Sequence, residues 1–152
     1  MEQIIQLNSG AKLSPHFTLG EFTKSSSHPE VYNIPSHEAI ANLKRLCGWL
    51  EVLRERYNEH PIVINSGYRS PQLNRKVGGV ATSNHLTGCA VDIRVSGQEQ
   101  LIIYAAILIE YANETHQDFD ELLIERNRYG AIWLHFAVRP DGNRRKIMFI
   151  NA

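Results

Sequence analysis

The sequence predicts an α+β fold in which helices pack on one side of a small, mainly antiparallel sheet. A long apolar stripe at helical spacing occupies the first half of the chain, and short β-branched runs separated by polar turns fill the last third. At 152 residues the chain suits one domain with its own core. We therefore expect a single domain over residues 1–152, in which residues 1–35 form an irregular N-terminal wrap.

The first predicted helix begins after Ser36, a residue type that favours the N-cap, and runs to about Asn58. Apolar side chains recur there at intervals of three and four residues, which is typical of a buried helix face. They are Ile40, Leu43, Leu46, Cys47, Leu50, Leu53 and Tyr57.

The middle of the chain alternates between strands and helices. The run "PIVINSGYRS" predicts a short strand that breaks at Gly67. Ser70 followed by proline predicts the start of a short helix, which the glycine pair at 78–79 ends. The run "CAVDIRV" predicts a second strand.

The C-terminal half begins with an apolar helix over Leu101–Ala112, for which Ser96 and Glu99 form a predicted capping box. Short polar or glycine-containing turns then separate three predicted strands, as in an antiparallel meander. These strands are Phe119–Glu125, Ala131–Val138 and Lys146–Asn151.

Composition excludes several classes of partner. Sixteen basic residues balance sixteen acidic ones, so we expect neither a nucleic-acid partner nor membrane insertion, and we expect a monomer. The one dense basic run, Arg139–Lys146, is interpreted as a solvated hairpin turn, with a contact for an anionic polymer as the alternative. The opening "MEQIIQLNSG" lacks the pattern of a secretory signal, which predicts synthesis in the cytoplasm. Cys47 and Cys89 are expected to be buried free thiols.

Three polar residues interrupt apolar surroundings. Strand alternation places Trp133 and His135 on the face opposite Leu134 and Phe136, and a lone histidine there is more often structural than a ligand. Asp92 lies inside the run "AVDI", where an unpaired carboxylate is costly to bury.

His85 precedes Asp92 by seven residues, and a tight turn at Gly88 would let both side chains converge. From the spacing alone, a metal site is one of two interpretations that stay open. The alternative is a surface histidine and an aspartate held by Arg94 or Arg69.

These residues resemble a known family. "SNHLTGCAVD" is similar to the Ser-x-His-x-x-Gly-x-Ala-x-Asp signature of the zinc peptidases grouped as lysostaphin, D-Ala-D-Ala peptidases and hedgehog. "INSGYRSPQLNRKVGG" resembles the strand and helix before that signature, "WLHFAV" the strand of the last histidine, and "HFTLGEFTKS" the opening of phage-type members. The resemblance implies a hedgehog-like, D-Ala-D-Ala-peptidase-like fold.

The resemblance implies that one Zn²⁺ is bound by His85, Asp92 and His135. Two imidazoles and a carboxylate are suitable zinc ligands, and three protein ligands leave the fourth position for water, as in catalytic sites. Bound metal lowers the pKa of that water from about 15.7 to about 7.

Catalysis also needs a carboxylate that moves the proton. Many relatives have it two or three residues before the last histidine, where this chain has Ile132 and Trp133. In the phage-type branch the acid comes from the neighbouring strand, which points to Glu125. Other acids near it in sequence are Asp118, Asp120 and Glu121.

The resemblance assigns Arg69 to the oxyanion or to a substrate carboxylate, and a structural salt bridge to Asp92 is the alternative. It assigns Ser83 to the substrate, and Trp133 would form a wall of the site. The predicted function is hydrolysis of an amide bond in peptidoglycan stem peptides by a D-Ala-D-Ala carboxypeptidase or an L-Ala–D-Glu endopeptidase. A phage or prophage enzyme that reaches the cell wall after release, or within the virion, is the expected setting. The alternative is a non-catalytic zinc module, hedgehog-like or structural in a virion.

Overall fold

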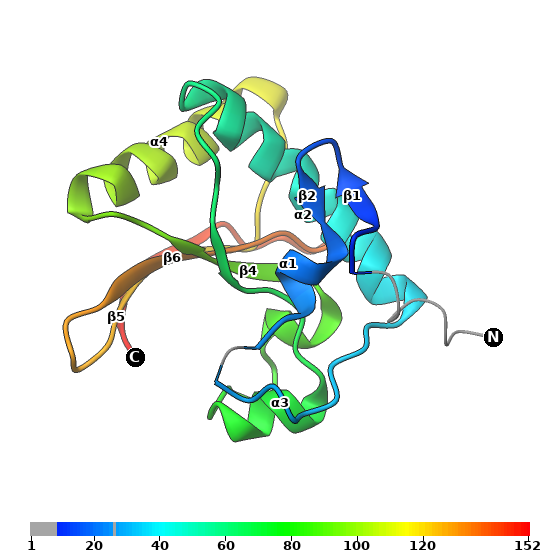
Figure 1. Ribbon diagram of the computed structural model, residues 1–152. Coiled ribbons are helices and arrows are strands. Elements are labelled where there is room, and N and C mark those ends of the chain that lie inside the picture. The colour runs from blue at the N-terminus through cyan, green and yellow to red at the C-terminus, as the bar shows by residue number, and fades with distance from the viewer. Residues whose placement is uncertain (1–8, 26) are drawn as a thin grey trace.

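The computed structural model describes residues 9–25 and 27–152, and a five-stranded sheet with the order β3-β4-β6-β5-β7 lies at its centre (Figure 1). The strands are β3 (Ile64–Ser66), β4 (Ala90–Arg94), β5 (Glu121–Arg126), β6 (Ile132–Ala137) and β7 (Lys146–Asn151). Two long helices, α2 (His37–Arg56) and α4 (Gln98–Thr115), cover one face of this sheet. The short α3 (Pro71–Lys76) and a 3-10 helix, η2 (Asn84–Thr87), lie on its other side. The predicted α+β class is confirmed.

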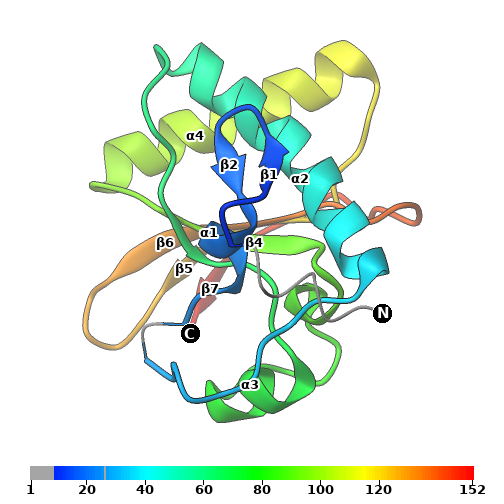
Figure 2. The same ribbon diagram turned by 45° about the vertical axis from the view of Figure 1, so that its right-hand side comes forward.

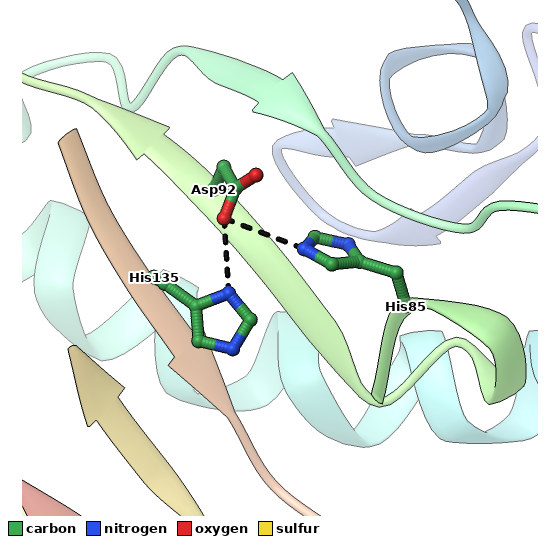
Figure 3. A group of neighbouring side chains, drawn as sticks. All are labelled: His85, Asp92 and His135. Carbon is green, nitrogen blue, oxygen red and sulfur yellow. Dashed lines mark hydrogen bonds and ion pairs between the residues drawn. The ribbon is translucent and has the colours of Figure 1, made fainter. Parts of the chain in front are cut away.

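Alternation along the central strands separates the core from the site. In β6, Leu134 and Phe136 are fully buried on the helix side, where Trp49 of α2 packs with its ring centroid 5.4 Å from that of Phe136. The intervening His135 faces the other way, toward His85 of η2 (Figure 3). The face of the sheet without the long helices is therefore free to carry polar chemistry.

The helix predicted after Ser36 is α2, and its cap is formed as expected. The Ser36 hydroxyl accepts a hydrogen bond from the Ala39 amide at 3.1 Å. The helix ends at Arg56, two residues earlier than predicted, because Asn58 adopts a left-handed backbone with φ of 59°.

The irregular wrap predicted for residues 1–35 is wrong between residues 12 and 23. There the chain forms a small hairpin, β1 (Lys12–Ser14) and β2 (Phe17–Thr18), followed by the helical turn α1 (Leu19–Thr23). Phe17 and Phe22 enter the core. The hairpin lies against α2 (Figure 2). Residues 1–8 lie outside the described residues.

The capping box predicted at Ser96 and Glu99 is also wrong. Helix α4 begins at Gln98 with Gly97 as its N-cap, and Gly97 has no side chain that could cap it. Instead, the side chain of Gln100 accepts a hydrogen bond from the Ser96 amide at 2.8 Å. The helix runs to Thr115 and is longer than predicted, yet in the described part of the chain no helix is long and apolar enough to cross a bilayer.

The last strand departs from the predicted meander. Strands β5 and β6 pair antiparallel as expected, but β7 lies parallel to β5 at the sheet edge instead of beside β6. The segment before β7 is held by Arg144, whose guanidinium donates to both carboxylate oxygens of the fully buried Asp120 at 2.9 and 2.8 Å. Arg139 contacts the same carboxylate at 3.2 Å. The basic run is therefore a crossing segment tied to the protein, and the solvated hairpin expected for it is wrong.

Cys47 and Cys89 are buried free thiols, as predicted. Burial raises the pKa of Cys47 to about 12 and raises that of Cys89 as well. Neither side chain offers a thiolate under ordinary conditions.

Candidate metal centre

The three residues predicted as metal ligands meet at one point. Asp92 on β4 lies directly opposite His135 on β6 in the antiparallel register, and η2 brings His85 beside them (Figure 3). One potential ligand atom from each lies within 4.8 Å of the others, and all three side chains are buried. The group could hold a metal ion.

The turn at Gly88 makes this convergence possible. Gly88 has a φ of 77°, and a Cβ atom there would lie 2.5 Å from the Ala39 carbonyl oxygen of α2. A residue with a side chain would therefore suffer both backbone strain and a clash. At the start of η2, the Ser83 hydroxyl accepts a hydrogen bond from the His85 amide at 3.1 Å. The bend predicted at Gly88 is confirmed.

Both imidazoles have one nitrogen turned toward Asp92 and the other bound elsewhere. His85 Nε2 lies 3.4 Å from Asp92 Oδ1, and its Nδ1 lies 2.7 Å from the Gly67 carbonyl oxygen. His135 Nδ1 lies 3.0 Å from the same Asp92 oxygen, and its Nε2 lies 2.8 Å from Glu121 Oε1. Histidine ligands of metals commonly show such outer hydrogen bonds.

The charge of the buried Asp92 carboxylate is balanced by its histidine neighbours. Burial acts to raise the pKa of Asp92, but the two histidines outweigh it and lower that pKa far below its ordinary range. Burial acts to lower the pKa of His135, but hydrogen bonds to Asp92 and Glu121 outweigh it and raise that pKa to about 10. The positive charge that stabilises these carboxylates can be a proton on His135 or a metal ion in its place.

The donor set fits zinc. Two imidazole nitrogens and one carboxylate oxygen are zinc ligands, and catalytic zinc sites use three protein ligands. Ligands about 2.0–2.2 Å from a tetrahedral ion lie about 3.3–3.6 Å apart. The distances from Asp92 Oδ1 to the inward nitrogens of His135 and His85, 3.0 and 3.4 Å, are close to that spacing.

A cavity of about 890 Å³ opens over this group. It brings together all seven residues predicted for the site. These are Arg69, Ser83, His85, Asp92, Glu125, Trp133 and His135. A substrate in the cavity would reach the inward face of the three candidate ligands.

Glu125 lies on β5 opposite Trp133, and the Trp133 indole Nε1 donates to Glu125 Oε1 at 2.5 Å. Burial raises the pKa of Glu125, and the nearby charge of Asp92 raises it further. Among the other acids considered, Asp118 is half-exposed and bound to Arg145 at 3.0 Å. Glu125 is therefore better placed than Asp118 to act in the cavity.

Arg69 is fixed beside the group. Its Nη2 lies 3.4 Å from Asp92 Oδ2, and its Nε and Nη1 bind Ser66 and Asn74, each at 3.3 Å. Burial lowers the pKa of Arg69, while the charge of Asp92 counteracts this. The salt bridge considered as the alternative role for Arg69 is thus present, and the guanidinium still lines the cavity.

Asn84 was not singled out from the sequence, and Glu121 was named only as one of several acids near Glu125. Asn84 donates to Glu121 Oε1 at 2.9 Å and to Asp120 Oδ2 at 2.8 Å, and Glu121 contacts His135. Strand alternation offered a signal for Glu121, because it shares a face of β5 with Glu125. No pattern in the sequence singled out Asn84.

Two histidines and one aspartate that line an open cavity make the three-ligand type of site that hydrolytic zinc centres use. The chain belongs to the Peptidase M15 family, whose sequence profile matches residues 15–127. That range includes His85, Asp92 and Glu125. It ends before His135, which the structure adds to the group.

The chain is also similar to the zinc D-Ala-D-Ala carboxypeptidase of Streptomyces albus G. The two are 29% identical over 96 residues, which cover 63% of this chain. The matched segment spans 38% of the length of that relative. The predicted resemblance to the zinc D-Ala-D-Ala peptidase branch is thereby confirmed.

Proposed function

We propose that this protein is a zinc metallopeptidase that hydrolyses an amide bond in the stem peptides of peptidoglycan. The observation that carries the proposal is the meeting of His85, Asp92 and His135 beneath a cavity that also contains Glu125. Membership of the Peptidase M15 family supports the reaction type. Similarity to a zinc D-Ala-D-Ala carboxypeptidase supports the substrate class.

His85, Asp92 and His135 would hold the ion, each through the atom that faces the other two. When bound there, zinc polarises a carbonyl group and lowers the pKa of water to about 7. The remaining steps fall to side chains of the cavity.

Glu125 would accept the proton of the attacking water and deliver it to the leaving amine. Its raised pKa suits this exchange, because a carboxyl group that gains and loses a proton works best when its pKa approaches the working pH. The hydrogen bond from Trp133 holds the carboxylate in the cavity. Trp133 would also form a wall for the substrate.

Arg69 would stabilise the negative charge that develops on the carbonyl oxygen or bind a carboxylate of the substrate. Ser83 would contact the substrate from the start of η2. Arg144 and Lys146 line the same cavity, and their charge suits a peptide that carries carboxylates. Both candidate bonds, terminal D-Ala-D-Ala and L-Ala–D-Glu, lie next to such groups.

The test compares wild type, Glu125→Gln and a matched control, Glu110→Gln, which alters an exposed carboxylate on α4. Each zinc-loaded protein is incubated with purified peptidoglycan, and the fragments are identified by mass spectrometry. We expect wild type and Glu110→Gln to cleave. Glu125→Gln should retain its zinc and lose roughly 100-fold or more of the rate.

The fragments also identify the bond. Release of D-Ala indicates the carboxypeptidase, and release of stem peptides that begin with D-Glu indicates the endopeptidase. If zinc-loaded wild type cleaves no stem peptide, the non-catalytic zinc module replaces this proposal.

We also propose one zinc per chain, a monomer and a single domain over residues 1–152. Elemental analysis and light scattering of the purified protein test the first two, and a single cooperative unfolding transition tests the third. A phage or prophage lytic role remains a prediction. Rapid lysis of host cells would support it, if the cells express the protein together with a partner that permits its secretion.

A further inference from the structure

We infer that Glu121 is a positioning residue that sets which nitrogen of His135 faces the metal, and thereby sets the affinity of the centre for zinc. This inference rests on the proposed zinc centre and assigns a new role within it. Glu121 Oε1 lies 2.8 Å from His135 Nε2, on the side of the ring away from Asp92.

The chemistry of the imidazole makes this contact consequential. A neutral imidazole carries one N–H and one lone pair, and only the nitrogen with the lone pair can bind a metal. An ionised carboxylate only accepts hydrogen bonds, so Glu121 requires the proton on His135 Nε2. Nδ1 faces a second carboxylate oxygen, Asp92 Oδ1, at 3.0 Å, and a bound ion would take the place of any proton on Nδ1, so that its lone pair would be the one that binds the metal.

Glu121 is itself held in place. Its side chain is only 16% exposed, and Asn84 Nδ2 donates to the same oxygen at 2.9 Å. The Asn84 amide is oriented by Arg139, whose Nε donates to Asn84 Oδ1 at 3.0 Å. Because Asn84 directly precedes His85, this network joins the segments that carry two of the candidate ligands.

The other imidazole is oriented differently. His85 Nδ1 lies 2.7 Å from the carbonyl oxygen of Gly67, a main-chain acceptor that no substitution removes. The role of the outer hydrogen bond can therefore be tested by substitution at Glu121 alone. Glu125, four residues further along the same strand, binds Trp133 and serves a different purpose.

Three variants distinguish the loss of the hydrogen-bond acceptor at Glu121 from the loss of its negative charge. Glu121→Gln keeps an oxygen that can accept from His135 but removes the charge, and Glu121→Ala removes both. Asp118→Ala removes a nearby carboxylate that is 55% exposed and bound to Arg145, and it is the control for charge alone. Zinc affinity is measured by competition with a chromophoric chelator, independently of any peptidase activity.

We expect the zinc dissociation constant of Glu121→Ala to rise roughly 10- to 100-fold, as is typical when an outer partner of a histidine ligand is lost. Glu121→Gln and Asp118→Ala should stay within about threefold of wild type, because both retain an acceptor at His135. Equal weakening of the Gln and Ala variants would overturn the inference, and so would unchanged affinity in Glu121→Ala.

A measurement on wild type covers the case in which Glu121→Ala does not fold. Long-range ¹H–¹⁵N NMR spectra of the zinc-loaded protein should show His135 protonated at Nε2 and bound through Nδ1, and the opposite assignment overturns the inference. Failure of this inference leaves peptidoglycan cleavage intact. Failure of wild type to bind zinc at all removes both proposals.

Discussion

Glu121 and Glu125 lie four residues apart on the same face of β5, yet their pKa values are shifted in opposite directions. Burial acts to raise both. For Glu121, hydrogen bonds from His135 and Asn84 outweigh burial and lower the pKa. For Glu125, the charge of Asp92 adds to burial and raises it. Such a separation lets one carboxylate remain a fixed acceptor while its neighbour exchanges protons.

The hydrogen bond from Trp133 to Glu125 predicts a shift in the pH profile. Glu125 accepts a proton only when ionised, so activity should fall as the pH drops through its pKa. The indole N–H stabilises the ionised form and lowers that pKa. In Trp133→Phe we therefore expect the acidic limb of kcat/KM to move to higher pH than in wild type.

The measurement is kcat/KM against pH for both proteins on one stem peptide. At pH values above this acidic limb, Trp133→Phe should retain most of its activity, because Glu125 is still present. A limb that moves to lower pH, or a loss of roughly 100-fold at every pH, would contradict the prediction.

Local signals singled out the candidate ligands, and the resemblance to the zinc peptidases joined them in one site. Asp92 stands out inside a strand that is otherwise buried, and strand alternation turns His135 away from the core. A glycine between His85 and Asp92 supplies the bend, and its φ of 77° confirms that reading. These signals depend on residues within a few positions of one another.

The features of the fold and site that could not be predicted from the sequence depend on contacts between distant segments. The apolar run after a polar turn predicted β7 as a strand, but its place beside β5 depends on Arg144 binding Asp120, 24 residues earlier. The role of Asn84 likewise depends on Glu121, 37 residues away. At the start of α4, Ser96 and Glu99 matched a local cap motif, whereas the side chain of Gln100 binds there instead.

Asp120 predicts a loss of stability in acid. Burial acts to raise its pKa, but hydrogen bonds from Arg144 and Asn84 outweigh it and lower the pKa from 3.8 to about 2. A carboxyl group with a lowered pKa stabilises the fold above its unfolded pKa and loses that contribution as the pH falls from about 4 to about 2. The contribution at neutral pH is about 2 kcal/mol.

Urea unfolding of wild type and Asp120→Asn between pH 7 and pH 2.5 measures this contribution of Asp120 to the free energy of unfolding. Asp120→Asn should be less stable at pH 7 by about 2 kcal/mol, and the difference should shrink as the pH falls below about 4. Asp118→Asn is the control, since its exposed pair with Arg145 should contribute less than about 1 kcal/mol. A difference for Asp120→Asn that does not change with pH would contradict the assignment.

The two cysteines should be inert in the folded protein. Both are buried, and burial raises the pKa of each thiol, so neither forms the reactive thiolate at pH 8. A chromogenic disulfide reagent should label the native protein only at the rate of unfolding and both thiols at once in denaturant. Fast labelling of one thiol in the native protein would show that Cys47 or Cys89 is accessible.

Gly88 offers a test of how the fold positions His85, with Gly78 as a matched control. Both glycines have a φ of 77°, so alanine is strained to the same degree at either site. A Cβ atom at Gly78 meets nothing within 4 Å, whereas one at Gly88 would lie 2.5 Å from a carbonyl oxygen of α2. Gly78→Ala should cost about 1 kcal/mol, and Gly88→Ala should cost about 2 to 4 kcal/mol, since η2 must also move away from the helix. Because η2 carries His85, only Gly88→Ala should weaken zinc binding as well, and equal zinc affinity in the two folded variants would show that this turn does not hold the ligand in place.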